Sequence, residues 1–419
     1  MSEKHSSLEG AEPLPHDIPP ALDVAALRGP RLGAPFYRLA VGEGFSFLAG
    51  EVFFVAILGE AAFGFRASPG ELAALVASWS VPFILTAAPF GIPADRWSPK
   101  WMLVIGNVMK LGAALIAFAA ASLGGLLVTS ALMGLAAGVL VPARGAFVPR
   151  LIPEDLLVRA NGLLGVVRHI PLLIGPVLGG FIARNVGQDA PYLLIGAAAL
   201  VAAAIASTLP DPRATSMEER VSITELAAGA REAWVVPELR RLLGYTLTAW
   251  FLLGLLIPLE PLFVKDVLGR GQDTLGLLWS LSGVGAVAGS FFLSKLKRGA
   301  GREENFIVLG IGGGGMGFLV YVALGTMAAA VFGSIVLGLG YAIVVAAGDA
   351  LIQRVAEQPG KVSGLFALTH ETGELAASGL VAVAGGVVLV QPWLIGAAVA
   401  MTTVGIAGLR MRRGALMTE

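Results

Sequence analysis

The sequence predicts an all-α membrane protein with twelve transmembrane helices, arranged as two six-helix pseudo-repeats around a central cavity. Hydrophobic residues make up 56% of the 419 residues and charged residues 14%, against about 25% charged in ordinary soluble domains. Apolar runs long enough to cross a bilayer, which takes about 20 helical residues, follow one another with short breaks. The runs lack the polar–apolar alternation of strands in a membrane barrel.

The order of these runs predicts the domain organisation. Residues 1–35 are rich in proline and acidic side chains and contain no apolar core of signal-peptide length, so we expect a disordered cytoplasmic tail, with partner binding as the alternative. Two six-helix bundles over 36–209 and 242–410, a linker over 210–241 and a tail over 411–419 complete the chain. The expected helices span 36–59, 70–92, 101–122, 125–148, 160–184, 190–209, 242–265, 273–296, 304–325, 327–353, 363–390 and 393–410.

Two breaks need separate comment. From Asn305 to Gly348 no residue is charged, so two helices must share this stretch, with a break near Gly325. The break over 210–241 is the longest, and its spacing of apolar and charged residues favours an amphipathic helix on the inner membrane surface.

Basic residues predict the orientation in the membrane. The connections on one side hold only Arg66, Arg184, Lys265 and Arg270, whereas most of the 29 Lys and Arg residues lie in the tails and the other connections. By the positive-inside rule, both termini are cytoplasmic. The cytoplasmic connections are then 96–100, 149–159, 210–241, 295–302 and 354–361, and the expected location is a bacterial cytoplasmic membrane.

The two halves resemble each other weakly. The segment that starts at Leu72 is echoed by the segment that starts at Leu275, and each begins the second helix of its half. Two similar halves that face each other leave a cavity between them, which is the geometry that alternating access requires.

A charged turn between two apolar runs carries Gly91, Asp95, Arg96 and Lys100. It is too short to be a domain, so it joins two membrane helices on one side of the bilayer. The glycine lets the helices approach closely, and the charged residues can pair at the helix ends.

A second motif lies in the 160–184 helix and reads Gly175-Pro176-Val-Leu-Gly179-Gly180. Gly175 and Gly179 are one turn apart on one face, where two helix backbones can touch. Pro176 removes a backbone donor and bends the helix.

With these two motifs the chain resembles the major facilitator superfamily across residues 36–410. The charged turn is similar to that superfamily's loop between its second and third helices, and the Gly-Pro motif to the antiporter signature of drug and metabolite exporters. Softer matches at 142–149, at Ala160-Asn161 and from Leu275 to Gly285 resemble the branch that contains macrolide efflux proteins, the enterobactin exporter and lysophospholipid transporters.

The resemblance implies gating roles for both motifs. In the turn, Asp95 would face a helix N-terminus or Arg144 and hold the inward-closed state; the alternative is a turn that only fixes topology. The face over 175–180 would pack across the two halves, against the row from Gly285 to Gly289, and favour export. The alternative is plain small-residue packing, which occurs in membrane helices of any function.

Charged residues inside the predicted helices are the candidates for proton coupling or substrate binding, because each costs about 2.5–3.5 kcal/mol at a helix centre. Glu51 lies past the midplane of a helix that lines the cavity in the family, where burial favours a carboxyl group that binds and releases a proton. Glu43 lies nearer the cytoplasm, and a buried Glu43–Arg168 ion pair is expected. For Arg168, structural pairing and binding of a substrate anion both stay open.

Other charged residues have more than one interpretation. Lys110 lies on a helix that is peripheral in the family, so snorkelling or an ion pair is expected. Glu260 lies near the outer mouth, where solvation at the entrance competes with a functional role. His370, Glu371 and Glu374 share one helix, and His370 and Glu374 are one turn apart; a solvated helix end competes with proton coupling through His370.

One departure from the family pattern concerns the helix over 125–148. Drug:proton antiporters carry an arginine four residues before a glycine in this helix. Here Gly138 is present but Gly134 stands at the arginine position, and Arg144 and Arg168 are the arginines available to replace it.

The predicted function is secondary active export of a small lipophilic or amphipathic compound by proton antiport, with the bilayer, protons and the small molecule as partners. Lipid translocation, a transport-inactive scaffold or sensor, and uptake by symport are the alternatives. No enzymatic activity, cofactor, metal or nucleic-acid partner is expected, because the chain lacks cysteine, its four histidines lack metal-ligand spacing, and the glycines at 310–317 do not form a phosphate loop.

Overall fold

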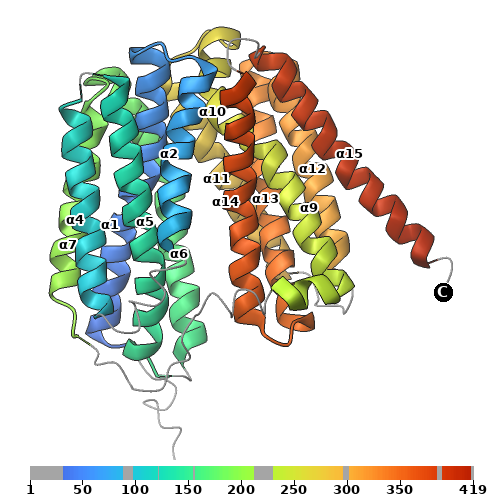
Figure 1. Cartoon of the computed structure of the whole chain (residues 1–419), viewed down its shortest axis with the longest axis horizontal. Coiled ribbons are helices and arrows are strands. Elements are labelled where there is room, and N and C mark those ends of the chain that lie inside the picture. The colour runs from blue at the N-terminus through green and yellow to red at the C-terminus, as the bar shows by residue number, and fades with distance from the viewer. Residues whose placement is uncertain are drawn as a thin grey trace, which may run out of the picture.

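The computed structural model of the chain describes residues 32–87, 98–120, 122–153, 156–211, 230–295, 302–384 and 389–416. These residues form helices and their connections, with no strand among them, which confirms the all-α prediction. Within them, eleven helical stretches are long and apolar enough to cross a membrane. The predicted helix over 363–390 is less apolar because it carries His370, Glu371 and Glu374, and it completes the C-terminal bundle (Figure 1).

The N-terminal bundle contains the first six predicted helices. Ser98 and Ser122 cap two of them by accepting hydrogen bonds from the backbone N–H groups of Trp101 and Gly125, respectively. The helices are α1 (Ala34–Gly59), continued by the π-helical turn η1 (Glu60–Gly64), α2 (Pro69–Ala87), α4 (Pro99–Phe118), α5 (Leu123–Leu151), α6 (Leu157–Asn185) and α7 (Ala190–Ser207).

The C-terminal bundle contains the other six. The predicted break at Gly325 is confirmed: the residue has a φ of 59° and joins α12 to α13. The elements are α9 (Pro237–Gly254), α10 (Leu256–Leu262), η3 (Phe263–Val267), α11 (Gln272–Lys295), α12 (Glu303–Ala323), α13 (Met327–Val355), α14 (Pro359–Ala384) and α15 (Val390–Leu416). The α9 helix begins before the predicted start at 242 because hydropathy does not detect its polar first turn.

The first helix of each half ends in the same way, which supports the predicted internal repeat. In η1 the N–H of Phe65 donates to the carbonyl oxygen of Glu60 at 3.0 Å, and in η3 the N–H of Leu268 donates to that of Phe263 at 3.0 Å. Each π turn is followed by a residue with positive φ, Arg66 at 55° and Gly269 at 61°. The corresponding residues of these two turns, such as Phe65 and Leu268, are the same number of residues apart in the sequence as Leu72 and Leu275.

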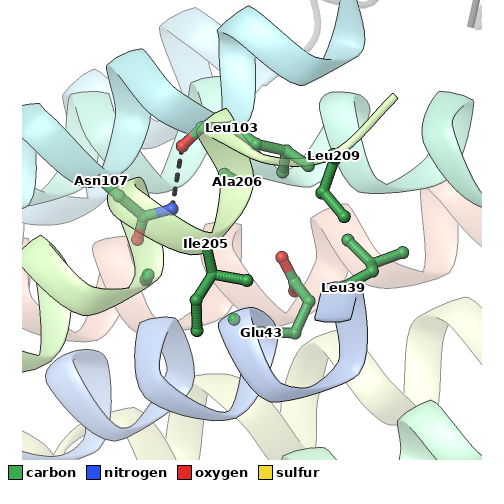
Figure 2. Close-up of a pocket in the computed structure, with 9 residues that line it drawn as sticks. Leu39, Glu43, Leu103, Asn107, Ile205, Ala206 and Leu209 are labelled. Atoms are coloured by element: carbon green, nitrogen blue, oxygen red, sulfur yellow. Dashed lines mark hydrogen bonds between the residues drawn. The ribbon is translucent and has the colours of Figure 1, made fainter. Parts of the chain in front are cut away.

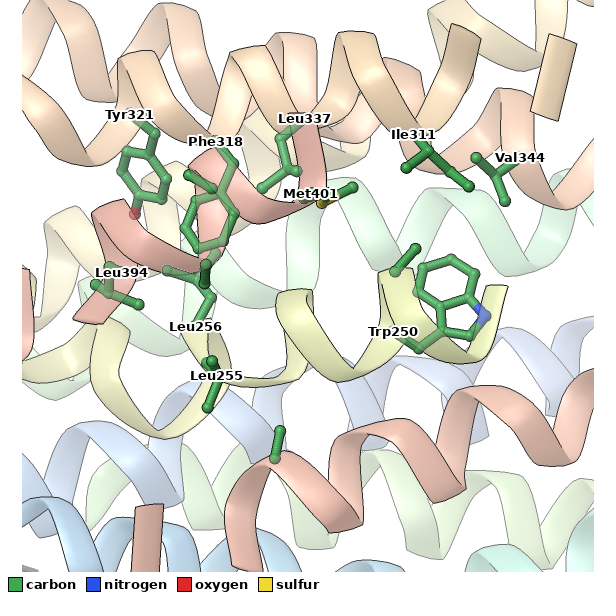
Figure 3. Packing of buried hydrophobic residues seen from close by; sticks show 14 of the residues in the cluster. Trp250, Leu255, Leu256, Ile311, Phe318, Tyr321, Leu337, Val344, Leu394 and Met401 are labelled. Atoms are coloured by element: carbon green, nitrogen blue, oxygen red, sulfur yellow. The ribbon is translucent and has the colours of Figure 1, made fainter. Parts of the chain in front are cut away.

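A buried apolar core holds the C-terminal bundle together. Side chains from α9, α10, α12, α13 and α15 meet in it (Figure 3). The ring of Phe318 lies next to Leu256, Tyr321 lies at the same end of the core, and Trp250 lies toward the other end, on the side of Ile311 and Val344. This core joins the helices of the C-terminal bundle, and at its edge it includes Ala73 of α2.

The two bundles touch most extensively through α6 with α11 and α2 with α14, and α1 and α2 make smaller contacts with α10 and α11. We call the end of the molecule with η1 and η3 the far end, and the end where α7 stops at Ser207 and α9 starts at Pro237 the linker end. At the far end the Arg184 guanidinium on α6 lies 2.6 Å from the Asp273 carboxylate on α11, and the Lys265 ammonium donates to the carbonyl oxygen of Ala62 at 2.8 Å. The bundles diverge toward the linker end (Figure 1).

Candidate transport site

A buried polar cluster lies inside the N-terminal bundle, where α1, α4 and α5 meet. Glu43 forms an ion pair with Arg144, and a guanidinium nitrogen of Arg144 donates to the Ser46 hydroxyl at 3.2 Å. The Lys110 ammonium donates to the Ser46 carbonyl oxygen at 2.8 Å and contacts its hydroxyl at 3.2 Å. The expected Glu43–Arg168 pair was therefore wrong, because α5 rather than α6 brings an arginine to Glu43.

Arg168 instead stacks on an aromatic ring. Its guanidinium carbon lies 5.2 Å from the centre of the Phe47 ring, and that of Arg144 lies 4.4 Å from the same centre. Within the described residues Arg168 forms no ion pair, and its side chain is exposed. Arg168 therefore presents a positive charge at the surface of α6.

A small hollow borders this cluster on its α7 side. Leu39 and Glu43 of α1, Asn107 of α4 and Ile205 of α7 line it (Figure 2). The Asn107 amide donates to the Leu103 carbonyl oxygen at 2.8 Å, while its own oxygen has no hydrogen-bond partner among the described residues. The free volume of about 10 Å³ suits one water molecule and not a transported compound.

Glu51 lies at the contact between α1 and α6. A Cβ atom at Gly175 would lie 2.7 Å from the Glu51 Cβ, and one at Gly179 would lie 3.2 Å from Val52, so both glycines face α1. Glu51 makes no hydrogen bond or ion pair with the rest of the described chain. The Gly175-Pro176 motif therefore packs against the helix segment that carries the Glu51 carboxyl group. The sequence did not indicate that these two features are in contact.

The contact across the two halves uses Gly180 of the predicted motif but a different glycine of α11 than expected. A Cβ at Gly180 would lie 2.6 Å from the Gln272 carbonyl oxygen, and Gly276 of α11 packs against the Pro176 backbone. The predicted partner row was wrong, because Gly285 and Gly289 pack against α13 of their own half. Gly276 and Gly283 meet α6, whereas Gly285 and Gly289 lie on a different face of α11 that meets α13.

A second polar cluster lies in the C-terminal bundle on α14. The His370 imidazole holds one carboxylate at each nitrogen, with Glu374 3.2 Å from Nε2 and Glu371 3.6 Å from Nδ1. The rings of Trp250 and His370 have centres 4.8 Å apart, and Trp250 and Tyr341 are 5.1 Å apart. All three side chains on α14 are half-buried rather than fully solvated.

This α14 cluster is also the place where a metal would fit best among the described residues, since its three ligand atoms lie within 4.8 Å of one another. However, the two carboxylates occupy opposite nitrogens of one imidazole ring. A single ion cannot bind both nitrogens, so the arrangement suits exchange of a proton or contact with a cationic group better.

Glu260 is buried inside the C-terminal bundle. Its side chain accepts hydrogen bonds from Trp279 Nε1 at 2.7 Å and from the Tyr321 hydroxyl at 2.5 Å, and the residue is 5% exposed. The expectation of a solvated entrance was therefore wrong. Trp279 also reaches Phe54 of the other half, with ring centres 6.4 Å apart. Sequence reasoning missed Trp279 and Tyr321, for which the only signal was that buried Trp and Tyr need polar partners.

Three residues of the charged turn, Gly91, Asp95 and Arg96, lie outside the described residues. Lys100 lies in the first turn of α4, and its ammonium lies 5.4 Å from the centre of the Trp101 ring. Gly134, which stands at the arginine position of the family pattern, packs directly on the Trp79 backbone of α2. An arginine there would separate α2 from α5.

The repeated bundles, the charges buried within them and the contacts between them define a polytopic helical membrane transporter. The sequence model of the Major Facilitator Superfamily matches residues 39–378, and the chain belongs to this superfamily. The chain is 22% identical over 354 residues to the uncharacterized MFS-type transporter YfiS of Bacillus subtilis (strain 168), covering 81% of this chain and 82% of that protein.

Other similar proteins are more distant or match a shorter part. The putative multidrug resistance protein MdtD of Yersinia pestis (strain Pestoides F) is 28% identical over 122 residues, which cover 28% of this chain and 26% of that protein. The crystal structure of the nucleoside transporter NupG has a TM-score of 0.72 at 14% identity, covering 90% of this chain and 99% of that one. A bacterial homolog of the lysosomal transporter Spinster has a TM-score of 0.66 at 13% identity, covering 89% and 93%. These two structures establish the fold alone.

Proposed function

We propose that the protein exports a small lipophilic or amphipathic compound from the cytoplasm by proton antiport. The similarity of part of the chain to a putative multidrug resistance protein supports export. The Gly175-Pro176 motif supports the same direction, because it resembles the antiporter signature of exporters.

The observation that carries the antiport proposal is the environment of Glu51. Glu43, on the same helix, is neutralised by Arg144, whereas Glu51 makes no described ion pair and packs on Gly175. A carboxyl group inside a membrane bundle without a partner favours its neutral form, so opening the bundle to water lets it release a proton. A change in the protonation of Glu51 therefore acts at the contact between α1 and α6.

The proposal also fixes the orientation. Both termini and the linker end are cytoplasmic, because basic residues concentrate in these segments. Residues 1–35 and 411–419 are then cytoplasmic tails, and 210–241 links the bundles 36–209 and 242–410. In the turn after α2, Asp95 and its neighbours gate the cytoplasmic side.

Accumulation assays test this function. Efflux-deficient bacteria expressing the wild type should accumulate less of at least one compound in a panel of lipophilic antibiotics, dyes and siderophores. The reduction should disappear in Glu51→Gln and on collapse of the proton gradient. Glu51→Asp keeps the carboxyl group and serves as the matched control, which should retain part of the efflux.

Two outcomes would contradict the proposal. Efflux that persists in Glu51→Gln makes Glu51 structural. If no compound is affected, translocation of a fluorescent lysophospholipid in liposomes is measured next, and headgroup-dependent flipping there would replace drug export with lipid translocation.

A further inference from the structure

Equivalent positions of the two halves carry an aromatic ring with neighbours of different charge. Phe47 on α1 and Trp250 on α9 are as far apart in the sequence as Glu60 and Phe263, where the two π turns begin. They therefore occupy equivalent positions along the first helix of each half. Phe47 contacts the guanidinium groups of Arg144 and Arg168. Trp250 contacts His370, which holds the two carboxylates of α14.

The same interval relates Arg168 on α6 to Glu371 on α14. Both helices lie at the contact between the bundles, since α6 packs on α11 and α14 packs on α2. Halves of this kind are related by an approximate two-fold axis, so equivalent positions on α6 and α14 face each other across it. Tyr341 on α13 lies next to Trp250, with ring centres 5.1 Å apart, and its side chain is 37% exposed.

The N-terminal cluster has an excess of positive charge, and the α14 cluster has an excess of carboxylates. Three cations of the N-terminal cluster, Lys110, Arg144 and Arg168, exceed its carboxylates even when Glu51 is counted with Glu43. On α14 two carboxylates, Glu371 and Glu374, share one imidazole. Charges that are withdrawn from water need partners, and one Oε atom of Glu371 is buried without a hydrogen-bond partner among the described residues.

We propose that the transported compound is a zwitterionic amphipath. Its anionic group binds Arg168, its cationic group binds Glu371 and Glu374, and its apolar body lies between Phe47 and Tyr341, the partly exposed ring that packs on the buried Trp250. This inference rests on the proposed transport function and names its substrate class. The rival explanation is that Arg168 and Glu371 pair directly when the linker end closes, with no role in recognition.

Binding of matched probes to the purified full-length protein in lipid nanodiscs tests the inference. The first set is a fluoroquinolone with a free carboxylate and a free amine, its methyl ester, which is only cationic, and its N-acetyl derivative, which is only anionic. The second set is a short-chain alkyl sulfobetaine with the matching alkylammonium and alkyl sulfonate. Affinity is measured by quenching of tryptophan fluorescence and by calorimetry.

The expected pattern is specific to each charge. In at least one set the zwitterion binds about tenfold or more tightly than either single-charge relative, as one additional charge-assisted contact provides. Arg168→Gln lowers the affinity for the zwitterion to that of the cationic probe and leaves the cationic probe unchanged. Glu371→Gln and Glu374→Gln weaken the zwitterion and the cationic probe and spare the anionic one. Arg168→Lys keeps the charge and retains discrimination, and Arg240→Gln, on the exposed surface of α9, is the neutral control.

Three results would overturn the proposal. One is that neither zwitterion binds more tightly than its relatives, including no binding at all. Another is that Arg168→Gln weakens all probes equally. The last is that transport is lost in Arg168→Glu and in Glu371→Arg but restored in the double variant with unchanged probe preference, which establishes the direct ion pair. Zwitterion binding with the expected pattern but without export from cells would leave the site intact and reject the export function instead.

Discussion

The two halves of the molecule share a scaffold but treat their charged groups differently. In the N-terminal half Glu43 is neutralised by Arg144, and Lys110 is satisfied by the carbonyl and hydroxyl oxygens of Ser46. In the C-terminal half the described partners of Glu260 are two neutral donors, and the α14 carboxylates share a single imidazole. The packing of glycines and apolar side chains therefore determines the repeated fold, while a few residues at equivalent positions determine the chemistry of each half.

Removal of one partner from the Glu43–Arg144 pair should have the largest effect on stability. Breaking a buried ion pair costs about 3–5 kcal/mol, because the remaining charge stays buried without a partner. Arg144→Gln should therefore lower the thermal midpoint in detergent strongly, whereas the double variant Arg144→Met with Glu43→Gln should recover most of the loss. Glu374→Gln in the other half should be milder, since His370 keeps Glu371. Equal losses in both halves would contradict the comparison.

Substitution at the contact between the halves should have an intermediate effect. Gly276 packs on the Pro176 backbone, so Gly276→Ala forces α6 and α11 apart at the far end, at a cost of about 1–3 kcal/mol. We expect reduced transport and faster labelling of a single cysteine placed near Asp273, which is straightforward because the native chain has no cysteine. Gly313→Ala, where a Cβ meets nothing within 4 Å, is the control. Normal transport and labelling in Gly276→Ala would argue against a tight far-end seal.

The smallest effect is expected from the exposed ion pair at the far end. The side chains of Arg184 and Asp273 are 60% and 32% exposed, and surface ion pairs contribute about 0–1 kcal/mol. Arg184→Gln should leave the thermal midpoint nearly unchanged and weaken the seal only at low salt. A large loss of stability in 0.5 M salt would mean that this pair, rather than glycine packing, holds the far end closed.

Sequence reasoning predicted the helices well and their partners less well. The break at Gly325 followed from the length of an uncharged stretch, because a bilayer fixes how long a helix can be. Pairing within the membrane did not follow, because helical spacing gives the face of a residue but not the neighbouring helix. Glu43 was thus expected to pair with Arg168 instead of Arg144, and Gly289 was expected to pack on the other half instead of on α13 of its own half. Glu260 was expected at a solvated mouth, since its hydrogen-bond donors come from distant segments of the chain.

The central claim is that Glu51 couples proton movement to transport, and proton flux in proteoliposomes tests it most directly. With a pH-sensitive dye inside the vesicles, addition of a transported compound should drive proton flux in the wild type. In Glu51→Gln the account predicts loss of this flux, while exchange of labelled for unlabelled compound continues, because the variant can still reorient with substrate bound. Undiminished proton flux in Glu51→Gln, or loss of exchange together with flux, would contradict the account.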